Sequence, residues 1–307
     1  MNRIEHQGRS WDGRFAKHLG GLDNVSTKKN ALSRRFFGIV HACRRLRRGF
    51  HRSLQAQLTL LHAVDFGAYV SPGTPDLWGT QATDLSREAA EWASETIKTY
   101  LAEDLKHLDV GRQVVQGDPA LKIVAAAKQS GTDLIMMPCH VLSVFRRYIL
   151  GSVTAKVLHD ADCAVWTGVH LEHSPPLETI RFRKVRCAVD LGPQSARALR
   201  WASGFSSEHS AELIVVHAVP AAGAQTRLNG LEDKGRKELQ ELLNALEITA
   251  RVIVAGGEPA KVTSEIAQRE NVDQMVIARG ASAEGFGGLR SHSYALIRSA
   301  PCPVVSV

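Results

Sequence analysis

The chain has 307 residues and a net charge of +7, and at about 150 residues per domain it predicts two domains, each able to bury a hydrophobic core. No apolar run approaches the ~20 residues of a membrane span, and residues 1–30 lack the apolar core of a signal peptide, so we expect a cytoplasmic protein without a membrane partner. The five cysteines form no C-x-x-C pair, which favours reduced core thiols over a disulfide framework or a structural zinc.

The positive charge is concentrated in one segment. Between Asn24 and Val64 there are nine basic residues and no acidic ones, whereas the rest of the chain has 29 basic and 31 acidic groups. The cluster Arg44–Arg48 suits mild, nonspecific contact with nucleic acid at low salt. No aromatic interleaving or recognised motif accompanies it, so we expect a solvated helix face and no specific nucleic-acid partner.

The first half of the chain alternates between helical and strand-like patterns. Residues 1–30 are polar and aperiodic, which predicts a flexible arm. From Phe36 to Phe50, apolar residues recur at helical spacing with arginines on the other face, which predicts an amphipathic helix. Asp118 and Pro119 have the residue types of an N-cap and a first helical turn. The remaining predicted elements are strands over 56–64, 110–116, 133–137 and 163–169, helices over 85–107 and 119–129, and a loop over 65–83.

A strand, a loop and a helix start follow one another between Asp133 and Leu158. The apolar run after Asp133 ends at Pro138, and Gly151-Ser152 opens an amphipathic run, which predicts a helix N-terminus. The first turn of a helix has unpaired N–H groups and the positive end of the helix dipole. This stretch therefore predicts a geometry that suits a bound phosphate.

The pattern begins again after residues 171–184, which contain Pro175-Pro176 and are interpreted as a linker. The difference in residue number between matching positions of the two halves falls only from 155 to 140 to 139. The halves are therefore copies that differ by shortened loops. We therefore expect a first domain over 31–170 and a second over 185–307. The matching pairs are Ala56–Val64 with Ala211–Val219, Asp118-Pro119-Ala120 with Glu258-Pro259-Ala260, Asp133 with Asp273, and Ala161-Asp162-Cys163 with Ala300-Pro301-Cys302.

Strands that alternate with helices predict a parallel sheet with helices on both faces and right-handed crossovers. Ligands of such sheets bind beyond the carboxyl ends of the strands, where the strand order reverses. The loop after Asp190 and the loop after Met137 are expected to open at that edge.

From about residue 34 to 307, the chain resembles the universal stress protein family in its tandem, two-domain form. The resemblance implies two Rossmann-like α/β domains, each with a doubly wound, parallel five-stranded sheet of strand order 3-2-1-4-5. It also implies an internal pseudo-dimer, which we expect to form by pairing of strands 163–169 and 302–307, and it is compatible with a homo-oligomer. The residues that carry it are L-T-L-L-H-A-V (58–64), M-P-C-H-V-L-S-V-F-R-R-Y-I-L-G-S-V-T-A-K-V-L (137–158) and A-P-C-P-V-V-S-V (300–307), together with the repeat.

By this resemblance, the first half has part of an ATP site. ATP-binding members of the family have an aspartate after the first strand, then a glycine, two residues, a glycine, nine residues and Gly-Ser or Gly-Thr. Pro138 and Val141 stand where the two earlier glycines belong, and proline has no N–H while valine resists positive φ. Arg35 stands in the place of the aspartate. The matching residues are Gly151, Ser152 and Thr154.

The second half has a different part of the same pattern. Asp190 matches the family's aspartate and Gly280 its first glycine, but the loop that follows is about three residues short. Arg290-Ser291-His292-Ser293 replaces the Gly-Ser start of the helix, where the arginine can attract a phosphate and Ser291 and Ser293 can donate hydrogen bonds to it. Each half therefore keeps what the other has lost.

The resemblance implies a stress-response role through sensing of ATP or another adenine nucleotide, with Mg²⁺ only as the partner of the nucleotide, or through protein contacts. A ligand-free interaction scaffold with degenerate pockets and a weak ATP hydrolase remain open. No readable motif places a general base beside a nucleophile, so we assign no catalytic residue. Cys139-His140 lacks a third metal ligand, and we interpret His62 and His217, at equivalent strand positions, as core or pocket-wall residues.

Overall fold

The structure is a computed structural model, and it describes residues 37–42, 57–65, 80–100, 102–103, 105–106, 109–137, 150–168, 181–221, 225–279 and 288–307. The predicted arm over 1–30 and the cluster Arg44–Arg48 lie outside these residues, as does most of the predicted linker.

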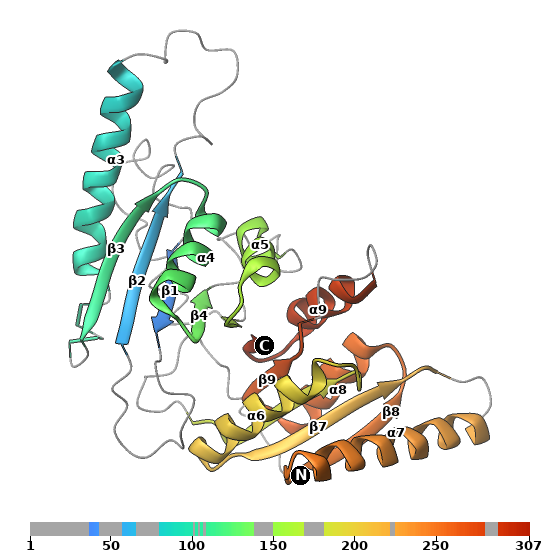
Figure 1. Cartoon of the computed structure of the whole chain (residues 1–307). Coiled ribbons are helices and arrows are strands. Elements are labelled where there is room, and N and C mark those ends of the chain that lie inside the picture. Colours follow the sequence, from blue (N-terminus) through green and yellow to red (C-terminus); the bar gives the residue numbers. More distant parts are fainter. Residues whose placement is uncertain are drawn as a thin grey trace, which may run out of the picture.

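One continuous sheet of ten strands runs through both halves of the described chain, in the order β3-β2-β1-β4-β5-β10-β9-β6-β7-β8 (Figure 1). Each half has the expected order 3-2-1-4-5. The strands are β1 (Phe37–Ala42), β2 (Gln57–Val64), β3 (Val110–Gln116), β4 (Leu134–Met137), β5 (Ala164–Thr167), β6 (Lys184–Val189), β7 (Glu212–Val219), β8 (Arg251–Gly256), β9 (Gln274–Ile277) and β10 (Val304–Ser306). The helices are α3 (Thr80–Thr99), α4 (Pro119–Ser130), α5 (Ser152–Asp160), α6 (Ser195–His209), α7 (Gln225–Ala245), α8 (Pro259–Glu270) and α9 (Gly288–Ser299).

The two halves join through their last strands. β10 pairs antiparallel with β5, Val305 lies opposite Trp166, and the Thr167 hydroxyl donates a 3.2 Å hydrogen bond to the carbonyl of Val304. This confirms the predicted pairing of the edge strands, which satisfies backbone groups that each half alone would leave open. The chain is thus an internal pseudo-dimer.

The first strand departs from the prediction. Where a helix was expected from Phe36, residues Phe37–Ala42 form β1, which runs antiparallel to both β2 and β4. In the second half, the equivalent β6 runs parallel to β7 and β9. The helix prediction was wrong over these residues because a six-residue apolar run containing Ile39-Val40 suits a strand as well as a helix turn. A strand between β2 and β4 also supplies partners to backbone groups that a helix would leave unpaired.

The connection after β1 is shorter than its counterpart. Only 14 residues separate β1 from β2, whereas 22 separate β6 from β7 and include α6. Antiparallel neighbours can be joined by a short connection, but parallel neighbours need a crossover of a dozen or more residues, usually with a helix. The sheet is therefore mixed in the first half and parallel within the second.

Several helix boundaries follow local sequence signals. α4 starts at Pro119 as predicted, and the Asp118 carboxylate caps it by accepting a 2.9 Å hydrogen bond from the N–H of Leu121. Glu258 repeats this cap at α8. The helix predicted over 85–107 is α3, which begins at Thr80 and ends at Thr99.

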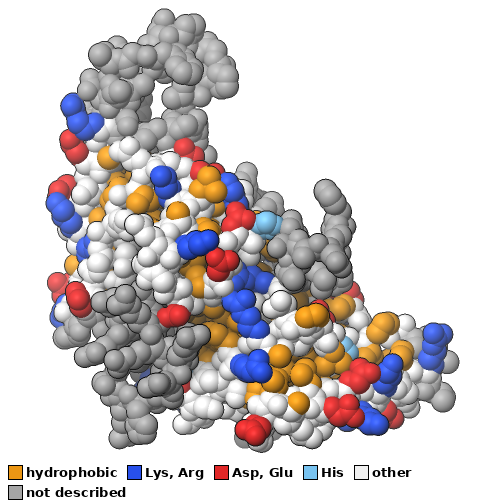
Figure 2. All heavy atoms as spheres, viewed as in Figure 1, with side chains coloured by type: hydrophobic (Ala, Val, Ile, Leu, Met, Phe, Trp, Pro, Cys, Tyr) orange, Lys and Arg blue, Asp and Glu red, His pale blue; other side chains and the backbone are white. Residues whose placement is uncertain are grey.

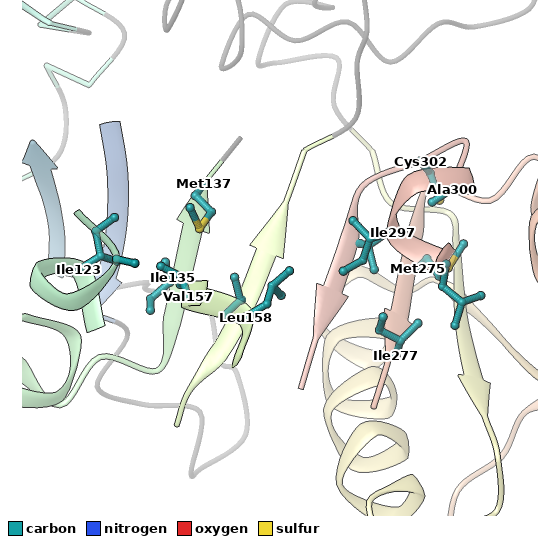
Figure 3. Packing of buried hydrophobic residues seen from close by; sticks show 14 of the residues in the cluster. Ile123, Ile135, Met137, Val157, Leu158, Met275, Ile277, Ile297, Ala300 and Cys302 are labelled. Atoms are coloured by element: carbon teal, nitrogen blue, oxygen red, sulfur yellow. The ribbon is translucent and has the colours of Figure 1, made fainter. Parts of the chain in front are cut away.

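Buried apolar side chains cover both faces of the sheet. On one face, a single cluster extends across both halves, and Figure 3 shows Ile135 and Val157 of the first half in the same row as Met275 and Ile297 of the second. The helices on this face are α4, α5, α8 and α9. On the other face, α3 covers the first half, and α6 and α7 cover the second. Among the described helices, none has the length and apolar character to cross a membrane.

Candidate functional site

Asp190 lies directly after β6, at the carboxyl edge of the second half. Its Oδ1 atom accepts hydrogen bonds from the N–H of Gly192 (2.8 Å) and from Oγ of Ser195 (3.1 Å). Within the described residues its Oδ2 atom accepts none, and the side chain is exposed. One oxygen therefore fixes the carboxylate and the other faces solvent at the edge where ligands bind in such sheets.

The turn after Asp190 depends on a small residue. Leu191 has a positive φ of 61°, and a Cβ at Gly192 would lie only 3.0 Å from Oδ1 of Asp190. Glycine therefore allows the backbone to approach the carboxylate closely. The turn leads into α6, whose buried Ser195 completes the support of Asp190.

His217 on β7 lies beside this turn. Its Nδ1 atom donates a 2.9 Å hydrogen bond to the carbonyl of Val189, the last residue of β6. The ring also lies close to α7, because a Cβ at Gly235 would be 3.0 Å from its Cδ2 atom. These contacts agree with a pocket-wall role for His217, and His62 in the first half is buried.

The other predicted residues of the second half follow β9. Because β6 and β9 are parallel neighbours, their carboxyl ends open at the same edge. Ser293 is half-buried in the second turn of α9. Gly280 and the side chain of Ser291 lie outside the described residues. That Gly280, Ser291 and Ser293 form one ligand site with Asp190 stays a prediction.

The predicted residues of the first half lie at the start of α5. Gly151 is the N-cap, with φ −61° and ψ 144°, and no described side chain caps this helix start. Ser152 is exposed, whereas Thr154 is 4% exposed and belongs to the buried layer. Because β1 is reversed, its carboxyl end lies at the opposite edge from those of β2 and β4. The first half therefore has no residue following β1 at its own ligand edge, and Asp190 lies in the other half.

Sequence reasoning missed Arg279, two residues after β9. Its guanidinium crosses to the first half and donates to the carbonyls of Cys163 and Leu158, the latter at 3.3 Å. Burial lowers the pKa of Arg279 to about 10, so the side chain stays charged at neutral pH. The only signal in the sequence is its place just before Gly280, because the contact joins residues 116 positions apart.

A cleft of about 1230 Å³ lies between the two halves, lined by residues of α4 in the first and of α6 in the second. Figure 2 shows Lys and Arg side chains along the furrow between the halves, and Lys128, Arg197 and Arg200 line the cleft together with three acidic residues. Of the residues predicted to bind nucleotide, those that the structure describes do not line it. Arg197 bridges the halves by donating a 2.8 Å hydrogen bond to the carbonyl of Asp162.

The described residues contain no cluster of three His, Cys, Asp or Glu side chains that could hold a metal ion. Cys163, Cys187 and Cys302 are free thiols, and burial raises the pKa of both Cys187 and Cys302 to about 12, which keeps them protonated and unreactive at neutral pH. Cys139-His140 lies outside the described residues.

Comparisons with known proteins agree with this architecture. A universal stress protein of Methanocaldococcus jannaschii is 26% identical over 114 residues, which are 37% of this chain and 65% of that protein, so the chain spans less than two thirds of that relative. The solved structure of a universal stress protein from Archaeoglobus fulgidus matches with a TM-score of 0.57 at 21% identity, over 81% of this chain and 85% of that one. A putative universal stress protein from Pseudomonas aeruginosa matches with a TM-score of 0.55 at 17% identity, over 81% and 92%.

The structural likenesses show the fold, and the sequence match shows the family. The model of the universal stress protein family matches residues 25–167 and again residues 181–307, so each half corresponds to one copy. The chain therefore belongs to the universal stress protein family, with two copies of its domain in tandem.

Proposed function

We propose that this universal stress protein acts in the stress response by binding an adenine nucleotide, such as ATP, in its second domain. The observation that carries the proposal is the Asp190 carboxylate, fixed through one oxygen at the end of β6 with the other oxygen open. Such an oxygen accepts hydrogen bonds from hydroxyl groups, as a ribose presents them. The proposed domains are residues 31–170 and 185–307, joined by a linker over 171–184.

The phosphates of the nucleotide would lie near the start of α9. The first turn of this helix offers unpaired N–H groups and a positive dipole end. By residue type, Arg290 would add a charge there and Ser291 a hydroxyl, and Ser293 of the second turn would add another hydroxyl. Mg²⁺ would accompany the nucleotide. We assign no catalytic residue, so we expect binding without substantial turnover.

The first domain has a weaker case. Its helix start at Gly151-Ser152 keeps open N–H groups, but its reversed β1 places no aspartate at that edge. We therefore propose that Gly151, Ser152 and Thr154 belong to a degenerate pocket, which does not hold a nucleotide by itself.

The proposal is tested by denaturing freshly purified protein and identifying any released nucleotide by mass spectrometry, followed by titration of the stripped protein with ATP, AMP and GTP. We expect an adenine nucleotide, or micromolar binding of one, with GTP clearly weaker. The absence of both would exclude the nucleotide function.

A ligand-free interaction scaffold is the second candidate, and the reversed β1 of the first domain favours it. A scaffold predicts that ATP leaves the melting temperature of the wild type unchanged. A rise in the wild type that is lost in Asp190→Ala would exclude it. Association of two copies of the chain stays a prediction.

A further inference from the structure

Helix α5 of the first domain is held by two side chains of the second. Arg279 donates to the carbonyl of Leu158, in the last turn of α5, and to that of Cys163 just before β5. Tyr294 on α9 donates a 3.0 Å hydrogen bond from its hydroxyl to the carbonyl of Ala155, in the middle of α5. Three carbonyls of the first domain therefore accept hydrogen bonds from two residues of the other domain.

Arg279 lies at the ligand edge of the second domain, and Tyr294 lies in the second turn of α9. The N–H of Arg279 donates to Val307 and that of Val307 to Ile277, each at 2.9 Å, so the β9–β10 ladder continues beyond the strands and fixes the backbone of Arg279. Tyr294 directly follows Ser293 on α9. The two residues therefore lie on either side of the segment that leads from β9 to α9.

The contact of Arg279 is difficult to replace by solvent. The side chain is half-buried, and within the described residues no carboxylate lies at ion-pair distance from it. Its charge instead faces carbonyl oxygens, one of them at the negative end of the α5 dipole. Charge-assisted hydrogen bonds are about twice as strong as neutral ones. Separating Arg279 from α5 would leave a cation and two carbonyls unpaired, so the two elements are expected to move together.

We propose that Arg279 and Tyr294 form a clamp that couples the ligand edge of the second domain to α5 of the first. This inference rests on the proposed nucleotide site, to which it adds regulation by the other domain. A nucleotide bound at the edge of the second domain then stabilises α5, and loosening α5 weakens nucleotide binding, because coupling between two sites is reciprocal. Arg279 and Tyr294 are positioning residues in this mechanism.

The test compares Tyr294→Phe and Arg279→Met with the matched control Thr167→Val. The control also removes one hydroxyl hydrogen bond across the domain boundary, at the β5–β10 ladder, but it does not touch α5. The measurements are the ATP affinity of each full-length variant and the hydrogen exchange of the α5 amides with and without ATP. We expect ATP to slow exchange in α5 of the wild type and of Thr167→Val.

In both clamp variants we expect the effect of ATP on α5 to disappear and the Kd for ATP to rise at least about fivefold, the lower end of usual coupling. Wild-type affinity together with retained protection of α5 would overturn the clamp. If the wild type binds no nucleotide, the proposed function fails, and the clamp is judged on exchange alone. Faster α5 exchange in the clamp variants and not in Thr167→Val would then support it, and unchanged exchange would overturn it.

Discussion

Asp133 and Asp273 occupy equivalent positions in the two domains but have opposite surroundings. Asp273 precedes β9, and its Oδ2 atom accepts hydrogen bonds from the N–H groups of Arg183 (2.7 Å) and Lys184 (2.9 Å) at the start of β6. Asp133 precedes β4, and its buried Oδ2 atom has no hydrogen-bond partner among the residues that the structure describes. The reversal of β1 explains the difference, because the start of a parallel strand would supply these donors and the end of an antiparallel one does not.

The first prediction is that alanine at these two positions has unequal effects. Asp273→Ala removes the acceptor of two N–H groups and should lower the free energy of unfolding by about 1–3 kcal/mol. Asp133→Ala loses no hydrogen bond, and it should be neutral or stabilising by less than about 1 kcal/mol, since the group is only partly buried. Urea denaturation at neutral pH measures both, and equal losses would contradict this explanation.

The second prediction concerns the pH dependence of the Asp133 effect. Burial raises the pKa of Asp133 above its ordinary value of 3.8. A raised pKa means that the stability associated with this group is present below pH 3.8 and is lost as the pH rises through the folded-state value. Any gain of Asp133→Ala at neutral pH should therefore shrink as the pH falls towards 3.8. A stability gain of Asp133→Ala that grows as the pH falls would contradict this prediction.

The third prediction concerns Arg186, which is fully buried in β6. It donates to the carbonyl of Thr263 and to the sulfur of Met275, but its Nε atom has no partner, and within the described chain no carboxylate pairs with it. Burial lowers its pKa to about 10. An unpaired buried charge is costly, so Arg186→Met should raise the free energy of unfolding at neutral pH by about 1–3 kcal/mol.

The Arg186 guanidinium binds fewer protons in the folded than in the unfolded state above about pH 10, so the stability gain of Arg186→Met over the wild type should shrink as the pH rises above that value. A loss of stability in Arg186→Met would show that the arginine is needed for the fold.

The sequence allowed much of this fold to be predicted, wherever the signals were local. The cap at Asp118, the strand over 110–116 and the pairing of the two last strands followed from residue type, period and the repeat. The same methods placed Asp190 after a strand. The distance in sequence from Asp190 to Ala211 in the second half could be compared with the same distance before Ala56 in the first.

The failures have physical causes. The direction of β1 depends on its neighbours in the sheet and on the length of its connection to β2, which the apolar period of Phe37–Ala42 does not encode. Arg279 was missed because its partners are the main-chain carbonyls of Leu158 and Cys163 in the other domain. Every residue has a main-chain carbonyl, so residue types do not reveal such a contact. The ligand site itself was predicted only by resemblance, and Gly280 and the side chain of Ser291 lie outside the described residues.

The fourth prediction concerns the support of Asp190. Ser195→Ala removes the 3.1 Å hydrogen bond to Oδ1 and should weaken ATP binding about threefold to tenfold, the equivalent of about one hydrogen bond. Ser206→Ala is the matched control, because the hydroxyl of this buried serine on the same helix makes no hydrogen bond within the part of the chain that the structure describes. Equal affinity in the two variants would show that Ser195 does not position the carboxylate for a ligand.

The most direct measurement of nucleotide binding by the second domain is the ATP dependence of stability in the wild type, Asp190→Ala and Asp233→Ala. The control also removes an exposed carboxylate, but from α7 and not from the turn after β6. At an ATP concentration about a hundred times Kd, the wild type and Asp233→Ala should gain about 2.7 kcal/mol, and Asp190→Ala should gain much less. No gain in any of the three proteins, or the same gain in all three, would contradict a nucleotide site built on Asp190.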